Sequence, residues 1–357
     1  MRDMDRTRID GLDVARAVAV LGMFAAHVGN SGRRASPGGW DWLWVTEGRP
    51  SALFAVMMGV SLALLVGRRL AGAAPDPTEH TEALRHSRVR IAMRAGVLIW
   101  IGYSLELLGT PVDVILVNLG LMMLLALPVL EWRSRWLALM AAVFVVGGRF
   151  VVEALAPRGG EAVVPVVPVF EKLWSYHYPA LAWMGYVLVG LIVGRMALRL
   201  GHTQAWLAAT GVVMAAVGYG LGPLLGGRGL HPEDPPGSVA WASVENHTYT
   251  PFEMTGNIGV ALVVIAACVW AASHARAAVW PLMALGSTAF TAYVTHIVII
   301  AVVGPEMVRE PSNTALIVMA ASITAAMCLV RWRARRGPLE WIMHRVSTVV
   351  ADRTRSA

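Results

Sequence analysis

The stretch IDGLDVARAVAVLGMFAAHVGN, residues 9–30, decides the fold. After a charged start it becomes an apolar run long enough to cross a bilayer, and His27 lies deep within that run. No small-residue cleavage site follows the run before the polar segment SGRRASPGG, as a signal peptide would require. We therefore interpret the stretch as a retained transmembrane helix.

Comparable apolar runs recur along the rest of the chain. Hydrophobic residues make up 56% of the 357 residues and charged residues 15%, whereas soluble domains carry roughly 25% charged residues. No polar block is long enough to fold alone. The sequence thus predicts an all-α integral membrane protein with about ten transmembrane helices, near 12–30, 50–67, 89–108, 112–130, 134–155, 177–198, 203–222, 253–273, 279–303 and 313–332.

The basic residues predict the orientation of these helices. If the N-terminus lies in the cytoplasm, 22 of the 30 Lys and Arg residues fall in cytoplasmic segments, as the positive-inside rule requires. We expect both termini inside and a multi-pass protein of the cell (plasma) membrane. Residues 1–336 form one membrane domain, and residues 337–357 form a cytoplasmic amphipathic tail that lies on the membrane.

The remaining composition excludes several classes of function. The net charge is +7, but the basic residues form short clusters between apolar runs and no continuous stripe, so the sequence does not indicate nucleic-acid binding. Cys268 and Cys328 lie inside apolar runs and are too few for a disulfide framework or a metal site. We expect no metal.

The first helix carries the most informative polar residues. At 100° per residue, Asp13, Arg16 and His27 share one face, with Arg16 near the cytoplasmic edge and His27 about 16 Å further along. Ionisable groups in a bilayer normally face a cavity or a partner, so this face predicts a polar groove through the membrane. Two alternatives are a His27 hydrogen bond between helices and an ion pair of Asp13 with Arg16.

Short motifs in a shared order resemble those of the YeiB-like proteins and of heparan-alpha-glucosaminide N-acetyltransferase. The spacing of Arg16 and His27 also resembles the first helix of the membrane acyltransferase-3 proteins. The motifs extend over nearly the whole chain: residues 9–27, Glu47-Gly48-Arg49-Pro50 to Phe54, Met58-Gly59 to Leu62, Asp113 to Asn118, Tyr178-Pro179 to Trp183, Gly190, Gly194-Arg195, Leu285-Gly286, His296 and Gly337 to Trp341.

The resemblance implies a transmembrane acyltransferase. Such an enzyme takes an acyl group, typically acetyl, from cytoplasmic acetyl-CoA or another acyl-CoA and passes it to a hydroxyl or amine on the other side. An envelope glycan or glycolipid is our hypothesis for the acceptor, and membrane lipids surround the protein. His27 is then the general base, with an acylated His27 as the open alternative.

Further residues are candidates for the same site. The predicted phosphate-binding arginines are Arg16, Arg85, Arg88, Arg90 and Arg94, with positive-inside topology as the alternative reading. Asn118 is a candidate oxyanion donor and His296 a second catalytic group, although both residue types also serve helix packing. An outer pocket is predicted from Glu47, Arg49, Glu245 and His247. The alternative is that the loops carrying these residues only connect helices.

Rival functions remain open from the sequence. In a transporter or flippase for a small anionic or lipid-linked substrate, the buried Arg, His and Glu residues would line a permeation path. The sequence shows no convincing self-similarity between its halves, which an inverted-repeat transporter would show. A silent membrane scaffold is a third alternative, and an apolar helix face could meet either lipid or a second protomer in a homodimer.

Overall fold

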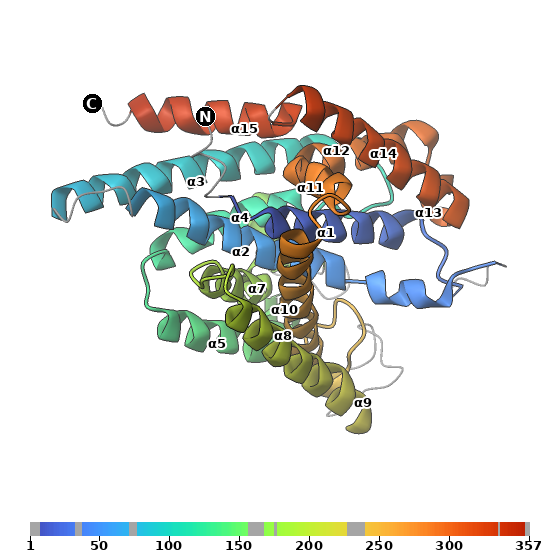
Figure 1. Ribbon diagram of the computed structural model, residues 1–357. Helices are drawn as coiled ribbons and strands as arrows, with labels where there is room; N and C mark the ends of the chain where they lie inside the picture. The colour runs from blue at the N-terminus through green and yellow to red at the C-terminus, as the bar shows by residue number, and fades with distance from the viewer. Residues whose placement is uncertain are drawn as a thin grey trace.

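A computed structural model describes residues 8–32, 38–70, 77–155, 168–174, 177–226, 240–334 and 336–353, and every regular element in these ranges is helical (Figure 1). The longer helices are α1 (Asp10–Val28), α2 (Arg49–Leu70), α3 (Pro77–Glu106), α4 (Leu116–Ala126), α5 (Ser134–Leu155), α7 (Ala180–Val193), α8 (Gly201–Ala216), α10 (Pro251–His274), α11 (Trp280–Ser287), α12 (Ala289–Val303), α14 (Asn313–Arg333) and α15 (Pro338–Arg353). The short elements are η1 (Asp41–Thr46), η2 (Leu127–Val129), α6 (Pro168–Glu171), the π-helical η3 (Val217–Leu221), α9 (Gly222–Leu224), η4 (Ala240–Ala242) and α13 (Glu306–Arg309).

Among the described residues, six helices are long and apolar enough to cross a membrane. They are α1, α2, α5, α8 with its continuation to Leu224, α10 and α14, and the pair α11 and α12, bent by 79°, raises the number to seven. Helices α4 and α7 are apolar but shorter, and the first half of α3 is rich in charged residues. A helix is thus present at each of the ten predicted positions, but ten crossings stay a prediction.

Helix α1 lies at the centre of the bundle. It packs against α2, α10 and α11, and it also contacts α12 and α14. Ala15, Ala17 and Ala19 are fully buried, because small side chains let neighbouring helices approach closely. By contrast, the apolar stretches of α5, α8 and α14 are only 22–28% buried. These three helices therefore form an outer rim with large apolar surfaces.

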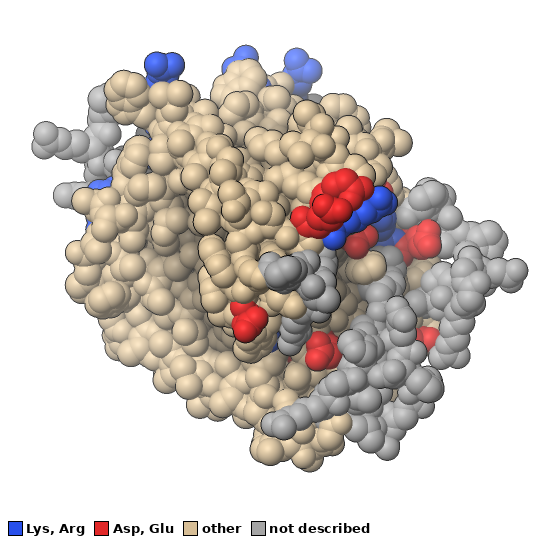
Figure 2. Space-filling model, turned by 90° about the vertical axis from the view of Figure 1, so that its right-hand side faces the viewer, with Lys and Arg blue, Asp and Glu red and all other residues tan. Residues whose placement is uncertain are grey.

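Polar contacts distinguish two ends of the bundle. At one end, here called the terminal end, α1 begins and α10 ends, and Arg276 binds Asp10 at 2.8 Å. At the other, distal end, the side-chain amide of Asn313 accepts a hydrogen bond from the backbone N–H of Asn30 and donates one to its backbone carbonyl. Figure 2 faces the distal end and shows acidic side chains scattered over a mostly uncharged surface.

Helix α15 is attached to the bundle at both of its ends. Near its start, the Glu340 carboxylate accepts hydrogen bonds from the backbone N–H groups of Phe290 and Thr291, and so caps the first turn of α12. Near its end, Asp352 accepts from His86 of α3 at 2.9 Å. Helices α15 and α3 lie side by side (Figure 1). One side of α15 is therefore buried against protein rather than only against a membrane surface.

The close contact of α1 with α11 generates a stability prediction. A Cβ atom on Gly286 would overlap the backbone carbonyl oxygen of Asp13, so Gly286→Ala must push the two helices apart. We expect a loss of about 2 kcal/mol or more in unfolding free energy, at the upper part of the usual range for overpacking. Thermal unfolding of detergent-purified protein measures the loss. The matched control is Gly147→Ala on the rim helix α5, where a Cβ meets open space and no loss is expected.

Candidate functional site

The centre of the candidate site is a contact between two imidazole rings. Nδ1 of His27 in α1 lies 3.1 Å from Nε2 of His296 in α12, and the rings stack with 5.3 Å between their centres. His296 is fully buried, with Phe24 and Tyr293 against its ring. The structure thus brings together two of the predicted catalytic residues. It also confirms a His27 hydrogen bond between helices, which the sequence left as an alternative to a chemical role.

The geometry of this contact restricts the tautomers. Two nitrogens at hydrogen-bond distance share one proton, so one ring donates and the other accepts. When His27 donates from Nδ1, its Nε2 carries the lone pair, and this nitrogen is free to take a proton from a ligand. His296 is then a positioning residue, because it fixes the tautomer of His27 without reaching the cavity.

His27 lines a cavity of about 380 Å³ that lies near the distal end of the bundle. The predicted outer-pocket residues Glu47 and His247 line the same cavity. Sequence reasoning did not select several other polar residues of its wall, which are Ser31, Thr46, Ser51, Asp113, His177, Tyr178 and Asn246. Ser51, Asp113 and Tyr178 lie within motifs that carried the family resemblance and His177 adjoins one, and that position was the available signal.

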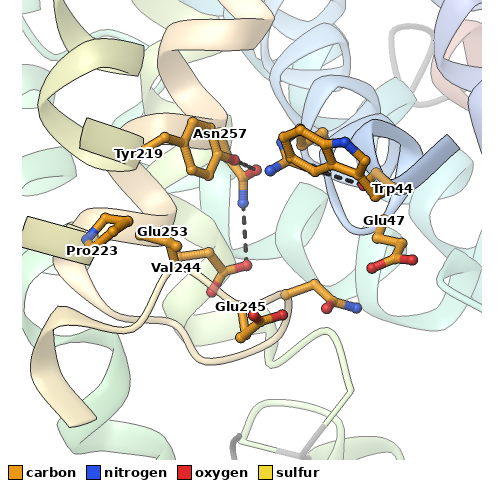
Figure 3. Close-up of a pocket in the computed structure, with 10 residues that line it drawn as sticks. Trp44, Glu47, Tyr219, Pro223, Val244, Glu245, Glu253 and Asn257 are labelled. Atoms are coloured by element: carbon orange, nitrogen blue, oxygen red, sulfur yellow. Dashed lines mark hydrogen bonds between the residues drawn. The ribbon is translucent and has the colours of Figure 1, made fainter. Parts of the chain in front are cut away.

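A second, smaller cavity adjoins the first. It measures about 210 Å³ and shares Glu47 and Asn246 with its neighbour. The predicted residues Arg49 and Glu245 line it, together with Trp44 (Figure 3). The Arg49 guanidinium lies over the rings of Trp44 and Tyr219, 4.8 and 4.5 Å from their centres. All four predicted outer-pocket residues therefore lie in one pair of connected cavities.

One wall of the smaller cavity is built around Glu253 of α10. Its buried carboxylate accepts hydrogen bonds from the backbone N–H groups of His247 and Tyr249. Asn257 donates to the same carboxylate and accepts from the Tyr219 hydroxyl (Figure 3). This network fixes the loop that carries His247, because a buried carboxylate requires its hydrogen bonds.

Three residues around the larger cavity have an unusual backbone conformation. Tyr178, His247 and Tyr249 have φ values of 56°, 63° and 54°, in the left-handed region that bulky residues rarely occupy. Tyr178 and His247 line the cavity, and the His247 ring contacts both tyrosines. Strained backbone of this kind clusters at functional sites. No sequence pattern marks these positions, since none of them is glycine or asparagine.

Asn118 has a structural role. It is buried in α4, and its amide nitrogen donates to the backbone carbonyl groups of Tyr178 and Lys172 at 2.7 and 3.2 Å. Both amide hydrogens are therefore occupied, and none remains for an oxyanion. The structure favours the alternative reading of a hydrogen bond between segments, in which Asn118 supports the backbone of the cavity residue Tyr178.

The predicted phosphate-binding arginines are at the terminal end and form two groups. Arg16 binds Asp13 at 2.7 Å, which confirms the expected ion pair, and also donates to Ser61 of α2 at 2.8 Å. The positive charges of Arg90 and Arg16 both act on the guanidinium of Arg94. Arg85 is exposed, and Arg88 lies 3.8 Å from Glu131. The structure thus brings three of the five predicted residues together.

The predicted polar groove between Arg16 and His27 is wrong for this conformation. The intervening positions of α1 that face the same way are Val20, Met23 and Phe24, and all three are buried in the hydrophobic core. Only the two ends of this helix face, at Arg16 and His27, are polar. In the described residues the His27 cavity lies towards the distal side, and an apolar layer separates it from the arginines.

In the described ranges, no group of three or more His, Cys, Asp or Glu side chains is arranged to hold a metal ion.

Comparison with protein families gives two matches. Residues 8–221 match the family described as heparan-alpha-glucosaminide N-acetyltransferase, catalytic, and residues 234–349 match the family described as protein of unknown function DUF418. No curated protein matches the chain. The two matches confirm the resemblance drawn from the motifs. They also divide the imidazole pair, because His27 lies in the first matched segment and His296 in the second.

The His247 loop generates a prediction about pH. Burial, and then the nearby His177, lower the pKa of His247 from 6.5 to about 4. The unfolded chain therefore takes up a proton before the folded protein does, and stability is lost as the pH falls from 6.5 towards 4. We expect His247→Gln to flatten this part of a thermal-unfolding profile against pH. Equal pH profiles for the variant and the wild type would contradict the assignment.

Proposed function

The chain belongs to the heparan-alpha-glucosaminide N-acetyltransferase catalytic family, and from this premise we propose that it transfers an acyl group, typically acetyl, across the membrane. The donor is a cytoplasmic acyl-CoA, and the acceptor is a hydroxyl or amine of an envelope glycan or glycolipid. The observation that carries the proposal is the His27–His296 contact at the wall of a polar cavity. An imidazole fixed by a second imidazole is suited to general-base catalysis.

The proposal includes an orientation for the bundle. The terminal end faces the cytoplasm, with ten crossings and both termini inside, so the His27 cavity opens on the outer side. The basic clusters support this orientation, because α3 and the end of α14 place their arginines at the terminal end.

The chemistry follows from the tautomer in which His27 donates to His296. Nε2 of His27 removes the proton from the acceptor hydroxyl or amine as that group attacks the thioester carbonyl carbon. The new C–O or C–N bond forms and the C–S bond breaks. The leaving thiolate takes the proton from His27 and departs as free coenzyme A. His296 stabilises the transient positive charge on His27, because it accepts a hydrogen bond from that ring.

The acceptor site is the pair of connected outer cavities. Glu47, Glu245 and Asn246 offer several hydrogen-bonding groups, and Trp44 adds an aromatic surface. A site with a few convergent polar groups and one aromatic surface fits a polyhydroxylated ligand. This supports a glycan or glycolipid headgroup over an apolar acceptor.

The apolar layer formed by Val20, Met23 and Phe24 requires a second conformation in the reaction cycle. The acyl thioester reaches His27 only when this layer parts, since α1 rises about 16 Å from Arg16 to His27. A cavity that opens to one side above a closed layer is also the geometry of alternating access. That observation keeps a transporter or flippase for a small anionic or lipid-linked substrate as the second candidate.

The two candidates make opposite demands on His27. For a transferase, we expect His27→Ala to lower acyl transfer by about a hundredfold or more, the usual contribution of a general base, with unchanged coenzyme A affinity. Release of free coenzyme A from acetyl-CoA by protein in nanodiscs measures the turnover. The matched control is His202→Ala at an exposed position of α8, which we expect to behave as wild type. Unchanged turnover in His27→Ala, with altered pH dependence of uptake, would favour the transporter.

The donor site is tested separately. We expect the double substitution Arg90→Ala with Arg94→Ala to weaken coenzyme A binding by about tenfold or more, since each charged hydrogen bond contributes about 1.5–3 kcal/mol. Isothermal titration of the nanodisc protein with acetyl-CoA measures the affinity. Arg135→Ala, an exposed arginine at the same end that lies against Trp136, is the charge-matched control. No heat with the wild type at millimolar acetyl-CoA would refute the proposed donor.

A further inference from the structure

Positive charges gather at the terminal end, on α1, on α3 and in the segment before α15. The charges that act most strongly on Arg94 are those of Arg90, Arg336 and Arg16. We call these four residues the cation cluster. The Nε atom of Arg94 is buried and has no hydrogen-bond partner among the described residues. Arg336 was not among the arginines that the sequence singled out.

Helix α15 brings a fifth basic residue to the cation cluster. The hydrogen bond between Asp352 and His86 fixes how α15 lies along α3, and the two helices run in opposite directions (Figure 1). Eight residues back from Asp352 is His344, and eight residues forward from His86 is Arg94. The pairing therefore places His344 opposite Arg94.

The electrostatics agree with this register. Burial lowers the pKa of His344, and the charges of Arg336, Arg90 and Arg94 lower it further. Nδ1 of His344 lies 3.4 Å from the Thr348 hydroxyl, which leaves Nε2 for another partner. Like charges held this close repel one another, and a polyanion would relieve the repulsion and recruit the ring as a donor.

The position of α15 is fixed by contacts outside the cluster. Glu340 binds the first turn of α12 through Phe290 and through both the backbone and the hydroxyl of Thr291. Asp352 binds His86 at the opposite end. Both attachments use groups other than Arg336 and His344, so these two basic residues are not needed to hold α15 in place.

We propose that α15 forms one wall of the donor site, and that Arg336 and His344 bind the phosphates of acyl-CoA together with Arg90 and Arg94. The inference rests on the proposed function. Coenzyme A carries a diphosphate and a further ribose phosphate, and clustered guanidinium groups bind such anions through charged hydrogen bonds. The C-terminal helix, predicted to lie on the membrane, would then belong to the catalytic machinery.

The test compares coenzyme A with pantetheine, which lacks the nucleotide and its phosphates. Titrations use full-length protein in nanodiscs of neutral lipid, as wild type and as Arg336→Ala with His344→Ala. We expect the double variant to bind coenzyme A about tenfold or more weakly, which corresponds to the loss of charged hydrogen bonds, and to bind pantetheine as wild type does. The control is Arg345→Ala on the same helix, where the arginine is exposed and lies over Trp341.

The outcomes separate this inference from the proposed function. Equal coenzyme A affinity in the double variant, with weakened binding in Arg90→Ala with Arg94→Ala, overturns the inference and leaves the proposed function standing. A wild type that binds no coenzyme A overturns both. Lipid headgroups also carry phosphate, so stabilisation against heat is compared in nanodiscs with and without anionic phospholipid. If the double variant loses only the heat stabilisation by anionic phospholipid and keeps the wild-type affinity for coenzyme A, the cluster binds lipid and the inference is overturned.

A second variant guards against misfolding of the first. His344→Arg keeps a side chain of basic character and adds a permanent charge opposite Arg94. We expect it to tighten coenzyme A binding, since a guanidinium offers more donors to a phosphate than an imidazole does. Weaker binding in this variant, with an unchanged unfolding temperature, contradicts the role of His344.

Discussion

The site depends on one hydrogen bond between two imidazole rings inside an apolar bundle. His27 and His296 are 3.1 Å apart and 269 positions apart in the chain. A buried ring nitrogen without a partner is costly, and here Nδ1 of His27 and Nε2 of His296 are paired with each other. The bond ties the central helix α1 to α12, and thus joins the two segments that match different families. It also leaves a single ring nitrogen of His27 for the outer cavity.

The elements around this pair have a consistent arrangement. Glu253 and its hydrogen-bonded loop form one wall of the smaller cavity, and Asn118 supports Tyr178 from α4. Glu340 caps α12, the helix that carries His296, from the C-terminal segment. The imidazole that orients His27 is therefore held in place partly by α15.

Much of the fold could be predicted from the sequence, because a long apolar run directly indicates a helix that can cross a lipid bilayer. Each predicted apolar run holds a helix, and the helical period of residues 13–27 placed Arg16 and His27 on one face. The contact of His27 with His296 was not predictable, since no local pattern links residues so far apart. The apolar layer was missed for a similar reason. Val20, Met23 and Phe24 are compatible with either a groove wall or a closed core, and only tertiary packing distinguishes the two.

The tail illustrates a second limit. An amphipathic pattern shows that one side of α15 is buried, but it does not show whether lipid or protein covers that side. The polar His86 and Asp352, which fix α15 on α3, come from distant segments. Among the outer residues, hydrophilic loop positions were easy to select, while the left-handed conformations of Tyr178 and His247 have no signature in their residue types.

The apolar layer beneath His27 has a consequence for the cell that houses this protein. Membranes store energy as ion and proton gradients, and a continuous water-filled channel with a titratable histidine in it would discharge them. Val20, Met23 and Phe24 exclude water from the middle of the bundle, and hydrophobic constrictions block ions by remaining dry. Under the proposed transfer, an acyl group crosses the bundle while the electrochemical potential is preserved.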